Sequence, residues 1–100
     1  MMAHRGVERA FQQAENSYYP FLMNHEDKRK MAFAMRKINE ELAIVMRHVD
    51  RRYREDIRNI GILIDRARFT LVSENSPREA HKMLQRAQMQ YNRMASYFIR

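Results

Sequence analysis

Arginine is the residue type in this sequence with the clearest binding chemistry. The stretch RHVDRRYREDIR, residues 47–58, holds five arginines among twelve residues. A guanidinium group binds phosphate or carboxylate through paired hydrogen bonds, so such a stretch is typical of a helix that lies along nucleic acid.

Acids spaced four residues from bases offer a different interpretation of the same stretch, because such pairs neutralise each other on a helix. Six pairs have this spacing: Glu26–Lys30, Arg36–Glu40, Lys37–Glu41, Asp50–Arg54, Arg51–Glu55 and Arg52–Asp56. We therefore interpret residues 47–58 mainly as a solvated helix face. Arg47 and Arg58 are its least compensated candidates for contact with an anion.

A stronger basic surface is expected near the end of the sequence. Residues 77–100 carry one acid and five bases, which on a helix lie opposite its apolar side: Arg78, Lys82, Arg86, Arg93 and Arg100. These are the main candidates for contact with nucleic acid or with an acidic protein surface. Residues 1–27 carry four acids and two bases, so the alternative is that this acidic part pairs with the last helix of the same or another copy.

Other chemistry has little support. The four histidines, His4, His25, His48 and His81, are not paired at the spacing that helical metal sites use, and we interpret them as surface residues. The sequence has no cysteine, which excludes disulfides, zinc–thiolate sites and a thiol nucleophile. Two isolated glycines cannot form a phosphate-binding loop. We expect no catalytic site, no metal, no cofactor and no enzymatic activity.

The elements that must position these side chains are expected to be helices. With only two Gly and two Pro among 100 residues, the composition predicts an all-α protein with one domain. Apolar residues at helical spacing predict a first helix over residues 7–18, before Pro20. Asn24 is placed to cap a second helix. In SENSPRE, Ser76 and Glu79 form a sequence pattern for a capping box that begins a helix over residues 77–99.

The longest predicted element is a helix over residues 25–72, with Gly61 as the point where it can kink. Its apolar positions step alternately by four and three, as in a coiled-coil seam: Met31, Met35, Ile38, Leu42, Val45 and Val49. Such a helix would be about 72 Å long, whereas residues 77–99 cover only about 34 Å as its antiparallel partner. Ile62 and Phe69 lie off the seam, which indicates packing on a second face.

The uncovered part of this seam predicts self-association. We expect a homodimer in which the long helical hairpin and the short N-terminal helix of each copy complete a helical bundle, with the six seam residues at the interface. The alternative is a sharp bend near Tyr53 or Gly61 that folds the chain into a monomeric four-helix bundle. Tyr18, Tyr19 and Phe21, which flank Pro20, either anchor the first helix or form a docking patch.

Together these features predict a small, non-enzymatic helical interaction or regulatory protein that self-associates and binds another macromolecule. The alternative is a basic nucleic-acid-binding protein that contacts the phosphate backbone through the last helix and residues 47–58. The formal net charge of +7 suits either anionic partner. The longest apolar runs, MAFAM and LAIVM, are too short for a transmembrane segment, and we expect an intracellular protein.

Overall fold

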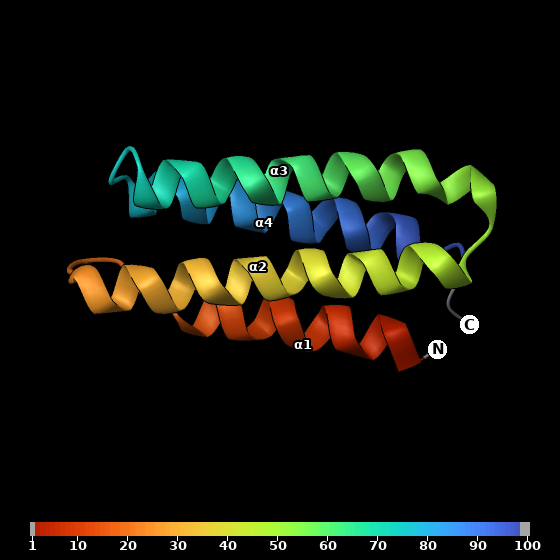
Figure 1. The fold of residues 1–100 in the computed structure, drawn as a ribbon, viewed down its shortest axis with the longest axis horizontal. Helices are drawn as coiled ribbons and strands as arrows, with labels where there is room; N and C mark the ends of the chain where they lie inside the picture. The colour runs from red at the N-terminus through yellow and green to blue at the C-terminus, as the bar shows by residue number, and fades with distance from the viewer. Residues whose placement is uncertain (1, 99–100) are drawn as a thin grey trace.

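Helices account for most of the described chain. The structure is a computed structural model that describes residues 2–98. Its elements are α1 (Met2–Asn16), α2 (His25–His48), the short 3-10 helix η1 (Arg51–Tyr53), α3 (Arg54–Val72) and α4 (Pro77–Ala95). The four α-helices run alternately in opposite directions and lie side by side in a bundle of 40 × 20 × 18 Å (Figure 1). The expected all-α fold is confirmed.

The expected continuous helix over residues 25–72 is wrong. α2 ends at His48, and Val49 and Asp50 adopt extended backbone angles before η1 begins. The carboxylate of Asp50 accepts a hydrogen bond of 2.9 Å from the backbone N–H of Arg52, so an aspartate cap starts the next element. Gly61 lies inside α3, where the helix continues without a break. The chain therefore folds back at residues 49–53, close to one of the two alternative bend positions.

The two caps expected from the sequence have different outcomes. Asn24 Oδ1 accepts a hydrogen bond of 2.8 Å from Asp27 N, and Asp27 Oδ2 accepts one of 3.0 Å from Asn24 N. This capping box confirms the expected start of α2. Ser76 stands at the N-cap position of α4, but the expected box with Glu79 is wrong, because Ser76 Oγ donates to the Glu74 carbonyl instead.

The first and last helices differ from their expected bounds. α1 begins at Met2 and ends at Asn16, where the backbone tightens: Ser17 N donates to the carbonyls of Gln13 and Ala14, and Tyr18 N donates to that of Glu15. The tightening precedes Pro20, whose ring disfavours helical backbone in the residue before it. α4 begins at Pro77 as expected, and residue 99 of its expected range lies outside the described residues.

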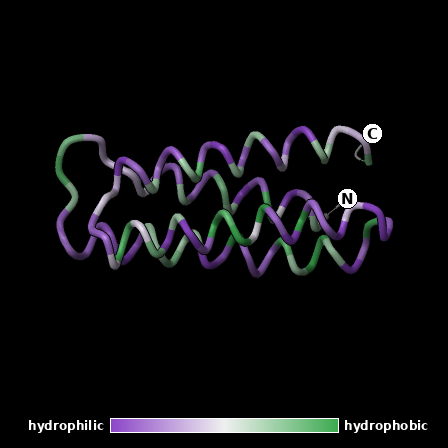
Figure 2. Tube along the Cα trace, turned by 90° about the horizontal axis from the view of Figure 1, so that it is seen from above, coloured by the Kyte–Doolittle hydropathy of each residue, from purple (hydrophilic) through white to green (hydrophobic). Residues whose placement is uncertain are grey.

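The apolar side of each helix faces the centre of the bundle. Hydrophilic and hydrophobic residues alternate along the helices, and the loop at one end carries a hydrophobic stretch (Figure 2). The largest fully buried side chains come from all four helices: Val7, Phe11, Met31, Met35, Ile38, Val45, Ile57, Ile60, Ile64, Leu71, Leu84 and Tyr91. The fold-back at residues 49–53 thus places α3 and α4 where they cover the apolar side of α2. Within residues 2–98, no helix is long and apolar enough to cross a membrane.

Candidate functional site

The arginine-rich stretch at residues 47–58 turns a corner of the bundle and does not form one straight track. Arg47 lies in the last turn of α2, whereas Arg58 lies in α3. Arg52 donates a hydrogen bond of 3.0 Å to the hydroxyl of Tyr53 and covers the ring of that residue. Arg58 lies 3.9 Å from Glu55, so it is not one of the least compensated bases.

The expected ion pairs at a spacing of four residues are absent from the described part of the chain. Pairs at a spacing of three residues form instead: Glu26–Arg29, Lys37–Glu40, Glu55–Arg58, Asp65–Arg68 and Glu79–Lys82. Both spacings bring side chains together on a helix surface, so the choice depends on side-chain rotamers and neighbouring groups. Exposed pairs of this kind contribute little to stability.

The basic residues of α4 are exposed as expected. Lys82 Nζ lies 3.4 Å from Glu79 Oε1, so it is partly compensated. Arg78, Arg86 and Arg93 are exposed and form no ion pair with another described residue. Arg100, the fifth candidate, lies outside the described residues. Three arginines therefore remain on α4 as an uncompensated basic surface.

Histidine side chains hold α1 against α4, although the sequence suggested a surface role for them. His81 Nε2 lies 2.7 Å from Glu15 Oε1, and the His81 ring stacks on Tyr18 with 3.9 Å between ring centroids. His4 Nδ1 lies 2.9 Å from the hydroxyl of Tyr91. The acidic N-terminal part thus contacts the last helix of its own chain through Glu15 and His81. None of the described bases that the sequence singled out on that helix pairs with an acid of residues 2–27.

Tyr91 is fully buried at this seam, and its environment affects its ionisation. Burial, and secondly the negative charge of Glu8, raise the pKa of the Tyr91 phenol well above its usual value. The neutral phenol is the form that the folded protein favours. The neutral hydroxyl can form a hydrogen bond with His4 Nδ1, and this bond links α4 to α1.

The expected self-association seam is buried within the chain. Met31, Met35, Ile38, Leu42 and Val45 are buried, and Val49 is half-buried. Ile62 and Phe69 are more than half exposed, so no helix of the same chain covers the second face that they form. Packing of that face against a partner stays a prediction. The length argument for a second copy no longer applies, because the fold-back lets the chain cover its own seam.

The aromatic residues beside Pro20 have divided roles. Tyr18 is half-buried on His81, so it anchors the chain after α1. Tyr19 and Phe21 are exposed, and Phe21 is 95% exposed. Leu22, which the sequence interpretation missed, is 83% exposed beside them. The exposed patch of this loop is therefore Tyr19, Phe21 and Leu22.

A groove between α2 and α3 combines apolar and basic side chains, and sequence reasoning did not find it. Its volume is about 450 Å³, and its lining residues are Glu26, Arg29, Lys30, Ala32, Phe33, Arg36, Arg68 and Val72. Phe33 and Val72 are each 61% exposed. The sequence signal was present in Phe33, an aromatic residue off the seam of α2 that has Lys30 and Arg36 three residues away on the same side of the helix.

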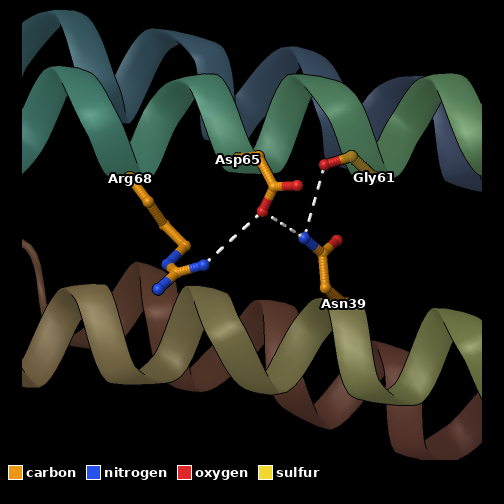
Figure 3. Close-up of polar contacts among 4 residues, drawn as sticks. All are labelled: Asn39, Gly61, Asp65 and Arg68. Atoms are coloured by element: carbon orange, nitrogen blue, oxygen red, sulfur yellow. Dashed lines mark hydrogen bonds and ion pairs between the residues drawn. The ribbon is translucent and has the colours of Figure 1, made fainter.

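A polar network beside this groove joins the two helices that form it (Figure 3). Asn39 Nδ2 donates hydrogen bonds to the Gly61 carbonyl, at 3.3 Å, and to Asp65 Oδ1, at 2.7 Å. A guanidinium nitrogen of Arg68 lies 3.5 Å from the same Asp65 oxygen. Asp65 therefore restrains Arg68, and Arg68 lines the groove.

A metal site has no counterpart in residues 2–98. No group of three or more His, Cys, Asp and Glu side chains there could hold a metal ion. No known protein family, curated protein or solved structure matches this chain. The candidate functional surfaces are therefore the groove between α2 and α3, the arginines of α4, and the exposed loop before α2.

Proposed function

We propose that this chain is a non-enzymatic, regulatory helical protein that binds an anionic macromolecule. The observation that supports this most is the groove between α2 and α3, where exposed Phe33 and Val72 lie among Arg29, Lys30, Arg36 and Arg68. The chain buries a core of its own and still exposes large apolar side chains beside bases. Such a combination is typical of a surface that contacts another macromolecule.

The charge of the chain supports an anionic partner. The formal net charge is +7, so a partner with negative charge is attracted over a distance and meets the chain more often. Once the partner is bound, the apolar side chains add affinity that does not depend on salt. Binding to an acidic polypeptide should therefore weaken with salt without disappearing. An intracellular location stays a prediction.

Homodimerisation remains part of the proposal, with a different surface. Because the original seam is buried, a second copy would contact Tyr19, Phe21 and Leu22, which the loop before α2 exposes. Sedimentation of the wild-type chain and of a Phe21→Ser, Leu22→Ser variant tests this. A wild-type dimer that this variant dissociates supports the proposal, and a wild-type monomer at micromolar concentration removes homodimerisation from it.

Nucleic-acid binding is the second candidate function. The observation that favours it is the set of exposed arginines on α4, Arg78, Arg86 and Arg93, which form no ion pair within residues 2–98. They would contact the phosphate backbone with little sequence specificity. Arg47 at the end of α2 could extend this contact, whereas Arg58 is paired with Glu55.

The test compares two ligands and two charge-reversal variants. Binding to polyglutamate and to a random DNA duplex is measured at two salt concentrations. If the duplex binds, the change of Arg86 and Arg93 to Glu should weaken it more than the same change at Arg51 and Arg52. Arg52 already donates a hydrogen bond to the Tyr53 hydroxyl, so it should contribute less to binding of a ligand. Absence of binding to both ligands at low salt contradicts the proposed function.

A further inference from the structure

The groove between α2 and α3 is long enough for a short helix. Its lining extends from Glu26 to Arg36 on α2, which corresponds to about 15 Å, or three helical turns. Phe33 of α2 and Val72 of α3 both line the groove, and each is 61% exposed. A helix laid between α2 and α3 would therefore meet apolar side chains from both.

The charges around this groove are strongly one-sided. Its lining contains four bases, Arg29, Lys30, Arg36 and Arg68, and one acid, Glu26. Glu26 lies 3.8 Å from Arg29. Lys30 and Arg36 form no ion pair with any residue that the structure describes. Two cations thus border the apolar floor without an ion-pair partner among residues 2–98.

Arg68 is the base in the groove with the most restricted position. Asp65 holds one side of its guanidinium at 3.5 Å, and Asn39 in turn holds Asp65 (Figure 3). The side chain is only 37% exposed, and its Nε is buried without a hydrogen-bond partner among the described residues. An arginine that is already positioned loses less conformational entropy when it binds a carboxylate.

We propose that this groove binds an acidic amphipathic helix of a partner protein. The apolar side of that helix would cover Phe33 and Val72, and its carboxylates would meet Lys30, Arg36 and Arg68. This mode of recognition, a helix in a groove, uses apolar residues at helical spacing for affinity and charge for orientation. The inference rests on the proposed function and specifies its partner.

Other occupants fit the groove less well. The same groove of a second copy would bring like charges together. The backbone of a nucleic acid offers phosphates for the basic side chains of the groove but no aliphatic groups to cover Phe33 and Val72. A membrane surface is broad, whereas this groove is confined between two helices. Only an acidic amphipathic helix satisfies both the apolar floor and the basic rim.

The first experiment uses fluorescence anisotropy with labelled synthetic peptides of about four helical turns. One peptide has Leu and Phe on one helical face and Glu elsewhere. The second has the same composition in an order that destroys the amphipathic pattern, and the third has Lys in place of Glu. The acidic amphipathic peptide should bind at least about tenfold more tightly than the scrambled peptide. The Lys peptide should not bind measurably.

The second experiment locates the binding site with matched variants. Arg36→Gln combined with Arg68→Gln removes two cations from the groove and should weaken binding of the acidic peptide about tenfold. Arg86→Gln combined with Arg93→Gln removes the same charge from α4 and should change binding less than about twofold. Phe33→Ser should also weaken binding about tenfold. Circular dichroism checks that each variant is folded, and Arg36→Gln alone repeats the test without disturbing Asp65.

Several outcomes would overturn the inference. If the scrambled peptide bound as tightly as the amphipathic one, binding would depend on overall charge and not on the groove. The same conclusion would follow if the α4 variant lost as much affinity as the groove variant. A wild-type dimer that Phe33→Ser dissociates would show that a second copy occupies the groove. Binding to a random duplex without binding to the peptide would reject the groove partner and leave the proposed function standing. Binding to anionic phosphatidylserine vesicles alone would reject both, because the target would then be a membrane surface. Absence of binding to all of these probes would reject both.

Discussion

The seam between α1 and α4 and the face formed by α2 and α3 use similar residue types in opposite ways. At the first, Tyr91 is fully buried and contacts His4, while His81 contacts Glu15. At the second, Phe33 is 61% exposed, and Asn39 and Asp65 form a polar link beside it. One pair of helices uses its aromatic and polar side chains to close the bundle. The other leaves an apolar surface open.

This difference separates stability from binding within one small fold. A buried aromatic side chain contributes its transfer free energy and its packing contacts to folding. An exposed aromatic side chain contributes little to folding and becomes useful when a partner covers it. Truncation of a buried side chain at the α1–α4 seam should therefore lower stability more than truncation of an exposed side chain on the α2–α3 face, which should instead affect binding.

Matched aromatic truncations give the largest expected contrast. Tyr91→Ala should lower the free energy of unfolding by about 3–5 kcal/mol, because it removes a fully buried ring. Phe33→Ala should change it by less than about 0.5 kcal/mol, because that ring is mostly exposed. Urea unfolding monitored by circular dichroism measures both. Similar losses in the two variants would contradict the division between the two regions.

Alkaline pH should weaken the α1–α4 seam specifically. The pKa of Tyr91 is raised in the folded state by burial and by Glu8, so folding favours the neutral phenol. Stability from this source is present below the usual tyrosine pKa of about 10 and is lost as pH rises above it. Urea unfolding at pH 8 and pH 11 should show a smaller loss in Tyr91→Phe than in the wild type. An equal loss of stability in the variant and the wild type would show that titratable groups other than Tyr91 cause it.

Double-mutant cycles compare the polar contacts of the two regions. The coupling between Glu15 and His81 should be about 1 kcal/mol, because the contact of 2.7 Å is partly buried. The coupling between Asn39 and Asp65 should be about half as large, because solvent reaches that bond. Each cycle uses alanine substitutions and urea unfolding. A larger coupling free energy for Asn39–Asp65 than for Glu15–His81 would contradict this prediction, because the α2–α3 contact would then stabilise the fold more.

A glycine on the α2–α3 side offers a small gain. A Cβ added at Gly61 would meet only Asn39 Oδ1, at 3.4 Å, so Gly61→Ala should raise the free energy of unfolding by about 0.5–1 kcal/mol. Gly6→Ala is the comparison, because its Cβ would collide with the Glu41 carboxylate and force that side chain to move. It should gain less. Destabilisation by Gly61→Ala would show that the two helices pack more tightly there than expected.

Local sequence patterns predicted which parts of the chain are helical but not the break between α2 and α3. The apolar stripe continues at helical spacing through Val49, Tyr53 and Ile57, so it looks the same whether the helix bends or not. The bend depends on Asp50, whose carboxylate caps η1. Capping was recognised at Asn24, where a long apolar stripe begins, but missed at Asp50, which lies inside one. Because the stripe looks continuous, the sequence also predicts that a second copy covers the seam of α2.

The basic surface of α4 could be predicted because a single helix forms it, whereas the groove between α2 and α3 could not. The exposed bases of α4 follow from the periodicity of that helix. The groove required Phe33 and Arg36 of one helix to lie beside Arg68 and Val72 of another, and no pattern along the chain contains that proximity. The contact of His81 with Glu15 likewise joins residues 66 positions apart.

The sequence by itself therefore determined the helical class, the inward side of each helix, the cap at Asn24 and the excess of positive charge. These properties depend on neighbours within a few residues, where backbone propensity and helical periodicity act. The tertiary structure decided where the chain folds back, which helices cover the seam of α2, and which apolar side chains stay exposed among bases. Those properties depend on how whole helices pack, because only packing removes apolar surface from water and brings distant side chains together.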